Sequence, residues 1–409
     1  MTDYNEERIL KNQTQSLCNI CFHEIHARVV QKRSQVFIQK SCPLHGDFEG
    51  LLEKDIDFYL RFAQLKVKGK PFFNGLVIPV TFKCNMSCSF CYTAYQNQAD
   101  IGLNQLREII GNFMGRGIYL SGGEPTLRED LFEIISIVKY FGKVCTLVTN
   151  GLKLSDKDYV KQLRQAGLDA VLLSFDSFKE ETYRLLKISY NNQYDIFKSK
   201  KIALENLEKE KIKTQLGITI YPGVNDNEIK DFFIFAMKKR SFVIGLRIRS
   251  CVNVGRFGEQ KQLFLSELLE LFYRQLGLNK KLLLDYFLDK KDDYHNIHHI
   301  QFRIRGLIIG ESLLPIYCKD NIPNKIISLP YLLKKLGAKQ FLKRFIDRLS
   351  KGVPLMTCQA RIICWPTKEN IDLQEVDRGI AHIYGLDKIL NFCHAIILLE
   401  QQNRRVADK

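Results

Sequence analysis

The middle of the chain alternates short apolar runs with longer amphipathic segments. The short runs have the length of buried strands, and they cover residues 75–82, 117–121, 144–149, 170–175, 213–221 and 242–249. The amphipathic segments that follow them cover residues 103–114, 128–141, 155–167, 198–210, 227–240 and 265–277. Strands that alternate with helices are typical of a parallel sheet, and eight such units close a full barrel. The sequence therefore predicts an α/β fold with a partial (β/α)6 barrel.

Polar and glycine-containing loops follow the predicted strands. Three cysteines follow the first strand and "SGGEPT" follows the second; Asn150 follows the third, "FDS" ends the fourth, and "YPGVNDNE" follows the fifth. The carboxyl ends of parallel strands meet at one end of a barrel, where the active sites of such folds lie. We therefore expect a functional site at this end.

The cysteine loop has the spacing C-x3-C-x2-C, formed by Cys84, Cys88 and Cys91. Soft thiolate ligands favour an iron–sulfur cluster or zinc. A 4Fe-4S cluster on three thiolates leaves one iron able to bind a further ligand. The alternative is a zinc knuckle completed by a distant Cys or His. Zinc knuckles prefer C-x2-C or C-x4-C pairs, so we favour the cluster.

This spacing, with Phe90 before the third cysteine and "GGEP" at 122–125 after the second strand, resembles the radical S-adenosylmethionine (SAM) superfamily. The resemblance spans residues 75–255. It implies a catalytic 4Fe-4S cluster on Cys84, Cys88 and Cys91, with SAM bound at the open iron. It also implies reductive cleavage of SAM to a 5'-deoxyadenosyl radical, abstraction of hydrogen from an organic substrate, and a low-potential electron donor of the flavodoxin or ferredoxin type.

The resemblance extends to residues around the SAM molecule. Gly122 and Gly123 would let the backbone approach the methionine moiety. Arg247, with Arg249 as its alternative, would hold the methionine carboxylate through a bidentate fork. Residues of this kind are also common in caps and turns. The complete set of expected cofactor contacts is Phe90, Gly122, Gly123, Glu124, Pro125, Asn150, Ser174, Asp176 and Arg247, with Asn225 as a weaker candidate.

A second metal site is predicted near the N-terminus. Two knuckles, C-x2-C and C-x2-H, supply four ligands: Cys18, Cys21, Cys42 and His45. Four ligands make a closed tetrahedral site, which is structural, and we expect zinc first and a rubredoxin-like iron second. His23 and His26 are alternatives to His45. Residues 27–40 alternate in the manner of a hairpin that would carry both knuckles.

This N-terminal pattern is similar to a subset of radical SAM enzymes that includes hydroxymethylpterin methyltransferases and tetraether lipid synthases. The similarity implies carbon methylation or carbon–carbon bond formation. "SFDS" at 174–177 departs from the "FDG" pattern of the lipid synthases, which leaves the substrate open. Two other functions stay open: a radical SAM enzyme that modifies a peptide or tRNA, and a zinc-ribbon protein that binds nucleic acid.

Charge and hydropathy limit the partners. The 409 residues carry a net charge of +16, which favours an anionic ligand, nucleic acid or an anionic surface. Lysines in a predicted helix at 331–351 are expected to form a solvated face.

No apolar run approaches the length of a transmembrane span, and the first residues show no secretory signal, so we predict a cytoplasmic enzyme without a transmembrane segment. Twelve cysteines in such a chain are better explained as metal ligands and buried thiols than as disulfides.

The predicted domains are an N-terminal zinc-type knuckle module (1–70), a radical SAM core (71–277) and an α-rich C-terminal module (278–409).

An auxiliary Fe-S cluster could be held by five later cysteines: Cys251, Cys318, Cys358, Cys364 and Cys393. The cysteine run of a SPASM domain is absent. Cys145 lies in an apolar strand and is expected to be packing. His295, His298 and His299 could bind a metal, but we expect a solvated helix or loop there.

Overall fold

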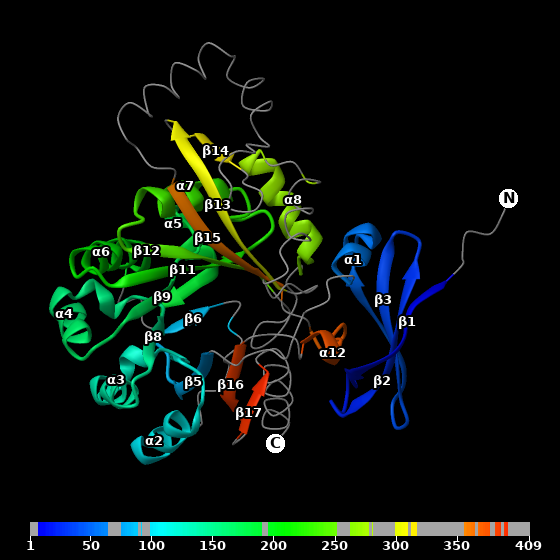
Figure 1. Ribbon diagram of the computed structural model, residues 1–409, viewed down its shortest axis with the longest axis horizontal. Coiled ribbons are helices and arrows are strands. Elements are labelled where there is room, and N and C mark those ends of the chain that lie inside the picture. The colour runs from blue at the N-terminus through cyan, green and yellow to red at the C-terminus, as the bar shows by residue number, and fades with distance from the viewer. Residues whose placement is uncertain are drawn as a thin grey trace, which may run out of the picture.

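The computed structural model describes residues 7–63, 75–88, 91, 99–189, 195–251, 262–277, 280, 299–309, 312–316, 356–364, 367–376, 381–385 and 388–391. Within these residues the chain forms an 11-stranded sheet, a four-stranded sheet and a two-stranded ladder. Figure 1 shows the four-stranded sheet standing to one side of the larger one. Among the described helices, no segment combines the length and hydropathy needed to cross a bilayer.

All six predicted strands and the helices after them are present. The strands are β5 (Gly75–Thr81), β7 (Gly117–Gly122), β8 (Val144–Thr149), β9 (Ala170–Ser174), β11 (Lys213–Ile220) and β12 (Val243–Ser250), and they pair in parallel in that order. The helices are α2 (Leu103–Asn112), α3 (Leu131–Tyr140), α4 (Lys157–Gln165), α6 (Ile196–Lys209), α7 (Ile229–Lys238) and α8 (Leu265–Leu276). The short elements η1 (Pro125–Leu127), η2 (Lys153–Ser155) and α5 (Glu180–Leu186) were not predicted.

The two faces of the large sheet differ in chemistry. Every second strand residue, such as Leu120, Leu147 and Leu216, is buried in one core with residues of the helices, which lie along the outside of the sheet in Figure 1. The intervening positions point to the opposite face because strand side chains alternate. We call this the inner face. On the parallel strands β7 to β12 it is made by Tyr119, Ser121, Thr146, Val148, Leu172, Ser174, Gln215, Gly217, Thr219, Arg247 and Arg249.

The C-terminal region extends this sheet at both edges. β15 (Met356–Ile363) pairs in parallel with β12, and β13 (His299–Ile309) and β14 (Ser312–Ile316) continue from it in antiparallel order. At the other edge, β16 (Ala381–Gly385) pairs with β5, and β17 (Lys388–Asn391) pairs with β16.

In the described part of 278–409 strands predominate and α12 (Leu373–Val376) is short. The α-rich content predicted for the region as a whole stays a prediction. The sequence "IQFRIR" at 300–305 has the period of two that marks a strand, and our prediction overlooked it. His299 begins strand β13 and is therefore in neither the helix nor the loop that was expected there. His295, His298 and the predicted helix at 331–351 lie outside the described residues.

The N-terminal module is an antiparallel meander. β1 (Arg8–Leu17), β2 (Glu24–Lys32), β3 (Gln35–Cys42) and β4 (Gly46–Glu53) pair in sequence order, and α1 (Ile56–Ala63) follows. The hairpin predicted at 27–40 is the β2–β3 pair.

Residues 367–376, which follow β15, pack on this N-terminal sheet, and Figure 1 shows α12 beside it. The buried Asp372 carboxylate accepts hydrogen bonds from Lys11 Nζ at 3.0 Å and Thr14 Oγ1 at 2.6 Å. Gly50 lies so close to this segment that an added Cβ would be 1.9 Å from Glu369 O. The segment that follows β15 of the large sheet thus packs against the N-terminal module.

Candidate functional site

The cysteine loop begins at the carboxyl end of β5 and is held by a short ladder. β6 (Met86–Cys88) pairs antiparallel with β10 (Lys187–Ser189), which places Cys88 opposite Lys187. The Cys91 amide donates to Cys88 O at 3.3 Å. Cys84 and Cys88 pack against an apolar cluster that includes Leu152 and Tyr183. Phe90 lies outside the described residues.

The three thiols and one carboxylate share this neighbourhood. Burial, together with the nearby Glu124 carboxylate and the Cys88 and Cys91 thiols, raises the pKa of the Cys84 thiol to about 12. A thiol in such surroundings ionises when a bound metal supplies positive charge, since a coordinating thiol loses its proton. The donor set, three sulfur atoms on one short loop, fits an iron–sulfur cluster.

The two glycines of "GGEP" hold the neighbouring loop against the backbone that leads to Cys84. Gly122 has φ of 126°, and a Cβ there would lie 2.0 Å from Thr81 O. A Cβ on Gly123 would lie 2.2 Å from Lys83 O. The Gly123 amide donates to Thr81 O at 2.7 Å, and the Glu124 amide donates to Lys83 O at 2.8 Å. The absence of side chains therefore permits a close approach of two backbone segments.

Glu124 is fully buried, and Pro125 after it begins η1. One carboxylate oxygen accepts from Thr126 N at 3.2 Å, Thr126 Oγ1 at 2.6 Å and Thr149 Oγ1 at 2.7 Å. The other oxygen accepts from Asn150 N at 2.7 Å. The carboxylate thereby fixes the "GGEP" loop to the carboxyl end of β8.

Asn150 continues this network to the cysteine loop. Its Nδ2 donates to Asn85 Oδ1 at 2.8 Å, and its backbone carbonyl accepts from Lys200 Nζ at 2.6 Å. Lys200 is fully buried and also donates to Ser174 O, so it joins the ends of β8 and β9. Lys200 was not predicted as a site residue. Its position between Ile196 and Leu204 on the apolar side of α6 was the signal available.

Asp176 and Asn225 tie β9 to β11. Asp176 Oδ1 accepts from Thr219 N at 2.8 Å, and Asp176 Oδ2 accepts from Ser174 Oγ at 3.4 Å. Asn225 Nδ2 donates to Asp176 O at 2.7 Å and to Thr219 O at 2.8 Å. Both residues are buried. These contacts fix the loops at the carboxyl ends of two adjacent strands.

Arginines occupy the inner face on the next two strands. Arg247 and Arg249 are half-buried on β12, and Arg249 Nε donates to Thr219 Oγ1 at 2.9 Å. β15 adds Arg361, directly beside Arg247 in the register. Arg361 was not predicted, since no local pattern indicates that β15 joins the sheet next to β12.

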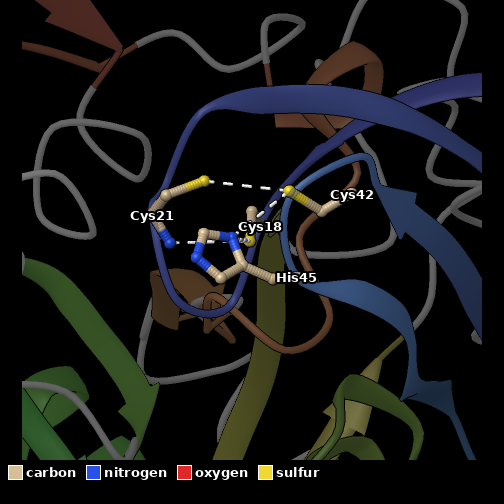
Figure 2. A group of neighbouring side chains, drawn as sticks. All are labelled: Cys18, Cys21, Cys42 and His45. Carbon is tan, nitrogen blue, oxygen red and sulfur yellow. Dashed lines mark hydrogen bonds between the residues drawn. The ribbon is translucent and has the colours of Figure 1, made fainter.

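The four predicted ligands of the N-terminal module come together at the ends of β1 and β3 (Figure 2). Their ligand atoms lie within 4.8 Å of one another, whereas His23 and His26 are not in the group. Cys21 Sγ lies 3.9 Å from Cys42 Sγ, and His45 Nδ1 lies 3.6 Å from Cys18 Sγ and 3.4 Å from Cys42 Sγ. A tetrahedral zinc ion with ordinary bond lengths separates two sulfurs by about 3.8 Å and a sulfur from a nitrogen by about 3.6 Å. This Cys/His group therefore has the dimensions of a zinc site.

Backbone hydrogen bonds also favour ionisation of one thiol in this Cys/His group, that of Cys18. Burial opposes ionisation of Cys18, but hydrogen bonds from the Cys21 and Ile20 amides, with help from the neighbouring thiols, lower its pKa to about 6. Burial raises the pKa of Cys21. The thiolate is the form of cysteine that binds a metal ion. A Cys18 thiol that is ionised at neutral pH therefore favours metal binding.

The remaining described cysteines are buried. Cys145 lies in the main core, as predicted. Cys358 and Cys364 also lie in that core, on the side that faces the helices, and burial raises the pKa of Cys358 to about 12 and that of Cys251 to about 11. Such surroundings are typical of structural cysteines. Cys318 and Cys393 lie outside the described residues.

Comparisons with known proteins agree with this two-module arrangement. Residues 78–236 match the radical SAM superfamily, and residues 10–54 match the HMPTM N-terminal zinc ribbon domain. A 7,8-dihydro-6-hydroxymethylpterin dimethyltransferase of Methanocaldococcus jannaschii is 27% identical over 284 residues, which cover 61% of this chain and 55% of the relative. A probable GTP 3',8-cyclase of Thermococcus kodakarensis is 35% identical over 178 residues, which cover 42% of this chain and 55% of the relative.

The chain thus spans about half the length of these curated relatives. Among solved structures, Streptococcus suis SuiB bound to S-adenosylmethionine aligns with a TM-score of 0.41 and 17% identity, over 53% of this chain and 48% of that chain.

Proposed function

We propose that this chain, an enzyme that carries a radical SAM domain behind an N-terminal zinc ribbon, holds a 4Fe-4S cluster on Cys84, Cys88 and Cys91 and cleaves SAM reductively. The observation that carries the proposal is the cysteine loop itself. It stands at the carboxyl end of β5, inside the matched region, and is braced by the β6–β10 ladder and by Asn150. The alternative of a zinc knuckle at these cysteines lacks such support.

The cluster, when bound, supplies the electron that splits SAM into methionine and a 5'-deoxyadenosyl radical. The chain's own residues position the reactants. Gly122 and Gly123 set the "GGEP" backbone beside the cysteine loop, and Glu124 holds it to β8. We assign SAM contacts to this loop, to the residues at the ends of β8 and β9, and to the aromatic side chain of Phe90. The curved sheet and its loops would exclude water from a reactive radical.

The zinc ribbon is proposed to be structural. Four ligands close the site of Cys18, Cys21, Cys42 and His45, and a zinc ion without an open position supports folding and not catalysis. The His ligand favours zinc over a rubredoxin-like iron. The electron for SAM cleavage is proposed to come from a flavodoxin-type or ferredoxin-type donor.

Carbon methylation is the reaction outcome that we favour, with carbon–carbon bond formation second. The relative named a dimethyltransferase aligns over 61% of this chain, and the ribbon matches a domain named for the same group of enzymes. The alternative of a nucleic-acid-binding zinc ribbon is less favoured, because the ribbon is joined to a radical SAM domain in one chain. Modification of a peptide or tRNA would use the same initial chemistry.

The test is SAM cleavage by the full chain after anaerobic reconstitution with iron and sulfide. We expect 5'-deoxyadenosine to form when the wild type is reduced, and the Cys88→Ala variant to lose at least about 100-fold of this activity while it retains zinc. Cys145→Ala is the matched control, because it removes a thiol from the core and should leave cleavage intact. Equal activity of wild type and Cys88→Ala, or a wild type that binds no cluster, would contradict the proposal.

A further inference from the structure

The amino ends of the barrel strands carry an excess of positive charge. Each of the strands β7, β8, β9, β11 and β12 is entered from the helix before it, and we call these five helix-to-strand segments the entry connections. Taken from the last two residues of the helix to the first residue of the strand, they cover residues 111–117, 139–144, 164–170, 208–213 and 237–243. They contain ten basic residues and three acidic ones. Seven of the basic residues are exposed: Arg116, Arg164, Lys209, Lys211, Lys213, Lys238 and Arg240.

The carboxyl ends of the strands have the opposite balance of charge. The loops after β7, β8, β9 and β11, taken from the last residue of the strand to the second residue of the next α-helix, cover residues 122–132, 149–158, 174–181 and 220–230. They contain ten acidic residues and five basic ones. Helix dipoles contribute to this asymmetry, because helix C-termini favour cations and helix N-termini favour anions. An anionic surface would therefore attract the entry connections and repel these four loops.

The entry connections also expose apolar side chains, which helix dipoles do not explain. The exposed fraction is 91% for Met114, 78% for Tyr140, 41% for Val144 and 36% for Phe141. Met114 lies in the connection from α2 to β7, and the other three lie in the connection from α3 to β8. These two connections adjoin, since Lys143 Nζ of the second donates to a backbone carbonyl of the first at 3.0 Å. The exposed apolar side chains therefore lie together within the basic end of the barrel.

The five entry connections form one continuous surface. Lys139 Nζ lies 2.6 Å from Asp169 Oδ2, which joins the connections that lead into β8 and β9. Lys239 Nζ lies 2.7 Å from Glu208 Oε2, which joins those that lead into β11 and β12. The first residues of β9 and β11 are partners in the parallel register, which joins the two halves. Two of the three acidic residues on this surface thus lie against lysines, and the basic residues remain in excess.

We propose that the entry connections bind the surface of an anionic lipid bilayer. Met114, Tyr140 and the side chains beside them would enter the headgroup region, while the lysines and arginines around them would lie against the lipid phosphates. Apolar side chains beside clustered basic residues are the composition of surfaces that lie on anionic membranes. In this orientation the carboxyl ends of the strands, where the cysteine loop begins, face the aqueous side.

The exposed side chains favour lipid over nucleic acid as the partner. Proteins that bind single strands stack the bases on aromatic rings. The most exposed apolar side chain here is Met114, and Val144 is aliphatic as well, so neither can form such a stack. Both can be buried among lipid chains, where removal from water stabilises them.

The test is co-sedimentation of the full-length, zinc-loaded protein with vesicles of phosphatidylcholine alone or of equal parts phosphatidylcholine and phosphatidylserine. We expect binding to the mixed vesicles only, and weaker binding as salt is raised. Each basic residue near the surface contributes about fivefold to affinity, so Lys211→Gln with Lys238→Gln should weaken binding roughly 20- to 30-fold. Met114→Ser should weaken it about five- to tenfold, because an apolar side chain no longer leaves water.

Two matched controls separate this surface from general charge and hydropathy. Lys157→Gln with Lys198→Gln removes two exposed lysines from the first turns of α4 and α6, at the opposite end of the barrel, and should change the affinity by less than about twofold. Leu185→Ser removes an apolar side chain that is 67% exposed on α5 and should have no effect. Zinc content and cooperative unfolding show that each variant is folded.

Four results would overturn the proposal. They are equal binding to the two kinds of vesicle, equal losses in the Lys211/Lys238 and Lys157/Lys198 variants, wild-type affinity of Met114→Ser, and a mixed-sequence RNA that binds the protein more tightly than the mixed vesicles do and loses affinity in the Lys211/Lys238 variant. The last result would assign the surface to nucleic acid. Vesicle binding requires neither a cluster nor SAM, so its failure is distinguishable from a failure of the proposed function in the 5'-deoxyadenosine assay.

Discussion

Several polar side chains at the ends of the strands form hydrogen bonds with the backbone of neighbouring loops. Glu124, Asp176 and Lys200 are all buried, and each bonds to backbone groups of a neighbouring loop. A buried charged group is stable only when such partners are present. The loops that carry the cysteines and the proposed SAM contacts are therefore held by a few buried ionisable residues.

Glu124→Gln tests this anchoring. The amide would place an NH2 group against either the Asn150 N–H or the three donors from Thr126 and Thr149, and at least one buried donor would lose its acceptor. We expect the free energy of unfolding to fall by about 1–3 kcal/mol in urea titrations, with lower SAM cleavage. Glu129→Gln, at an exposed position, is the control. Unchanged stability of Glu124→Gln would show that the carboxylate is not needed as an acceptor.

At the scale of elements, periodicity predicted the six barrel strands to within a residue or two, because each strand is buried by its own helix. Periodicity did not predict the elements that depend on a distant partner. The β6–β10 ladder is three residues long and forms only because the chain after α5 returns to the cysteine loop. Similarly, "GGEP" was correctly placed after β7, but its contact with 81–83 is a tertiary feature that spacing does not encode.

Gly123→Ala measures the importance of that contact. Its Cβ would lie 2.2 Å from Lys83 O and 2.7 Å from Phe82 O, so the backbone before Cys84 must shift. We expect iron and sulfide content after reconstitution to fall several-fold while zinc content stays constant, with a stability loss of about 1–3 kcal/mol. Gly102→Ala, which has no heavy atom within 4 Å of its Cβ, is the matched control. A normal cluster content in Gly123→Ala would refute the role assigned to this close approach.

At the scale of the whole molecule, the zinc ribbon and the barrel are joined at two places. One is the segment 367–376, which leaves β15 and packs on β1 and β4 through Asp372 and Asn370. The other is the junction of β4 with α8, where Lys54 pairs with Glu267 at 2.8 Å. Neither junction could be predicted, since both join residues more than two hundred positions apart. The ribbon's four ligands, by contrast, were evident from local spacing alone.

Glu53 makes the second junction sensitive to pH. It ends β4, is buried, and accepts hydrogen bonds from Ser266 Oγ at 2.5 Å and Lys54 N at 2.6 Å. Burial raises the pKa of Glu53 to about 7, against the hydrogen bonds, which lower it. The folded state therefore holds a proton that the unfolded chain releases near its ordinary pKa of 4.5. The stabilisation is complete below that pH and is lost as the pH rises through 7.

The charged groups that face this junction are Lys54, Asp55, Glu267 and Lys280, and Glu53→Gln leaves all of them in place. We expect the unfolding free energy of the wild type, relative to that of Glu53→Gln, to fall by roughly 3 kcal/mol between pH 4.5 and 8. Urea titrations at several pH values measure this difference, and histidine titration cancels in it. Parallel curves for the two proteins would mean that Glu53 is ionised in the folded state across the whole range, and that the ribbon docks on α8 without a bound proton.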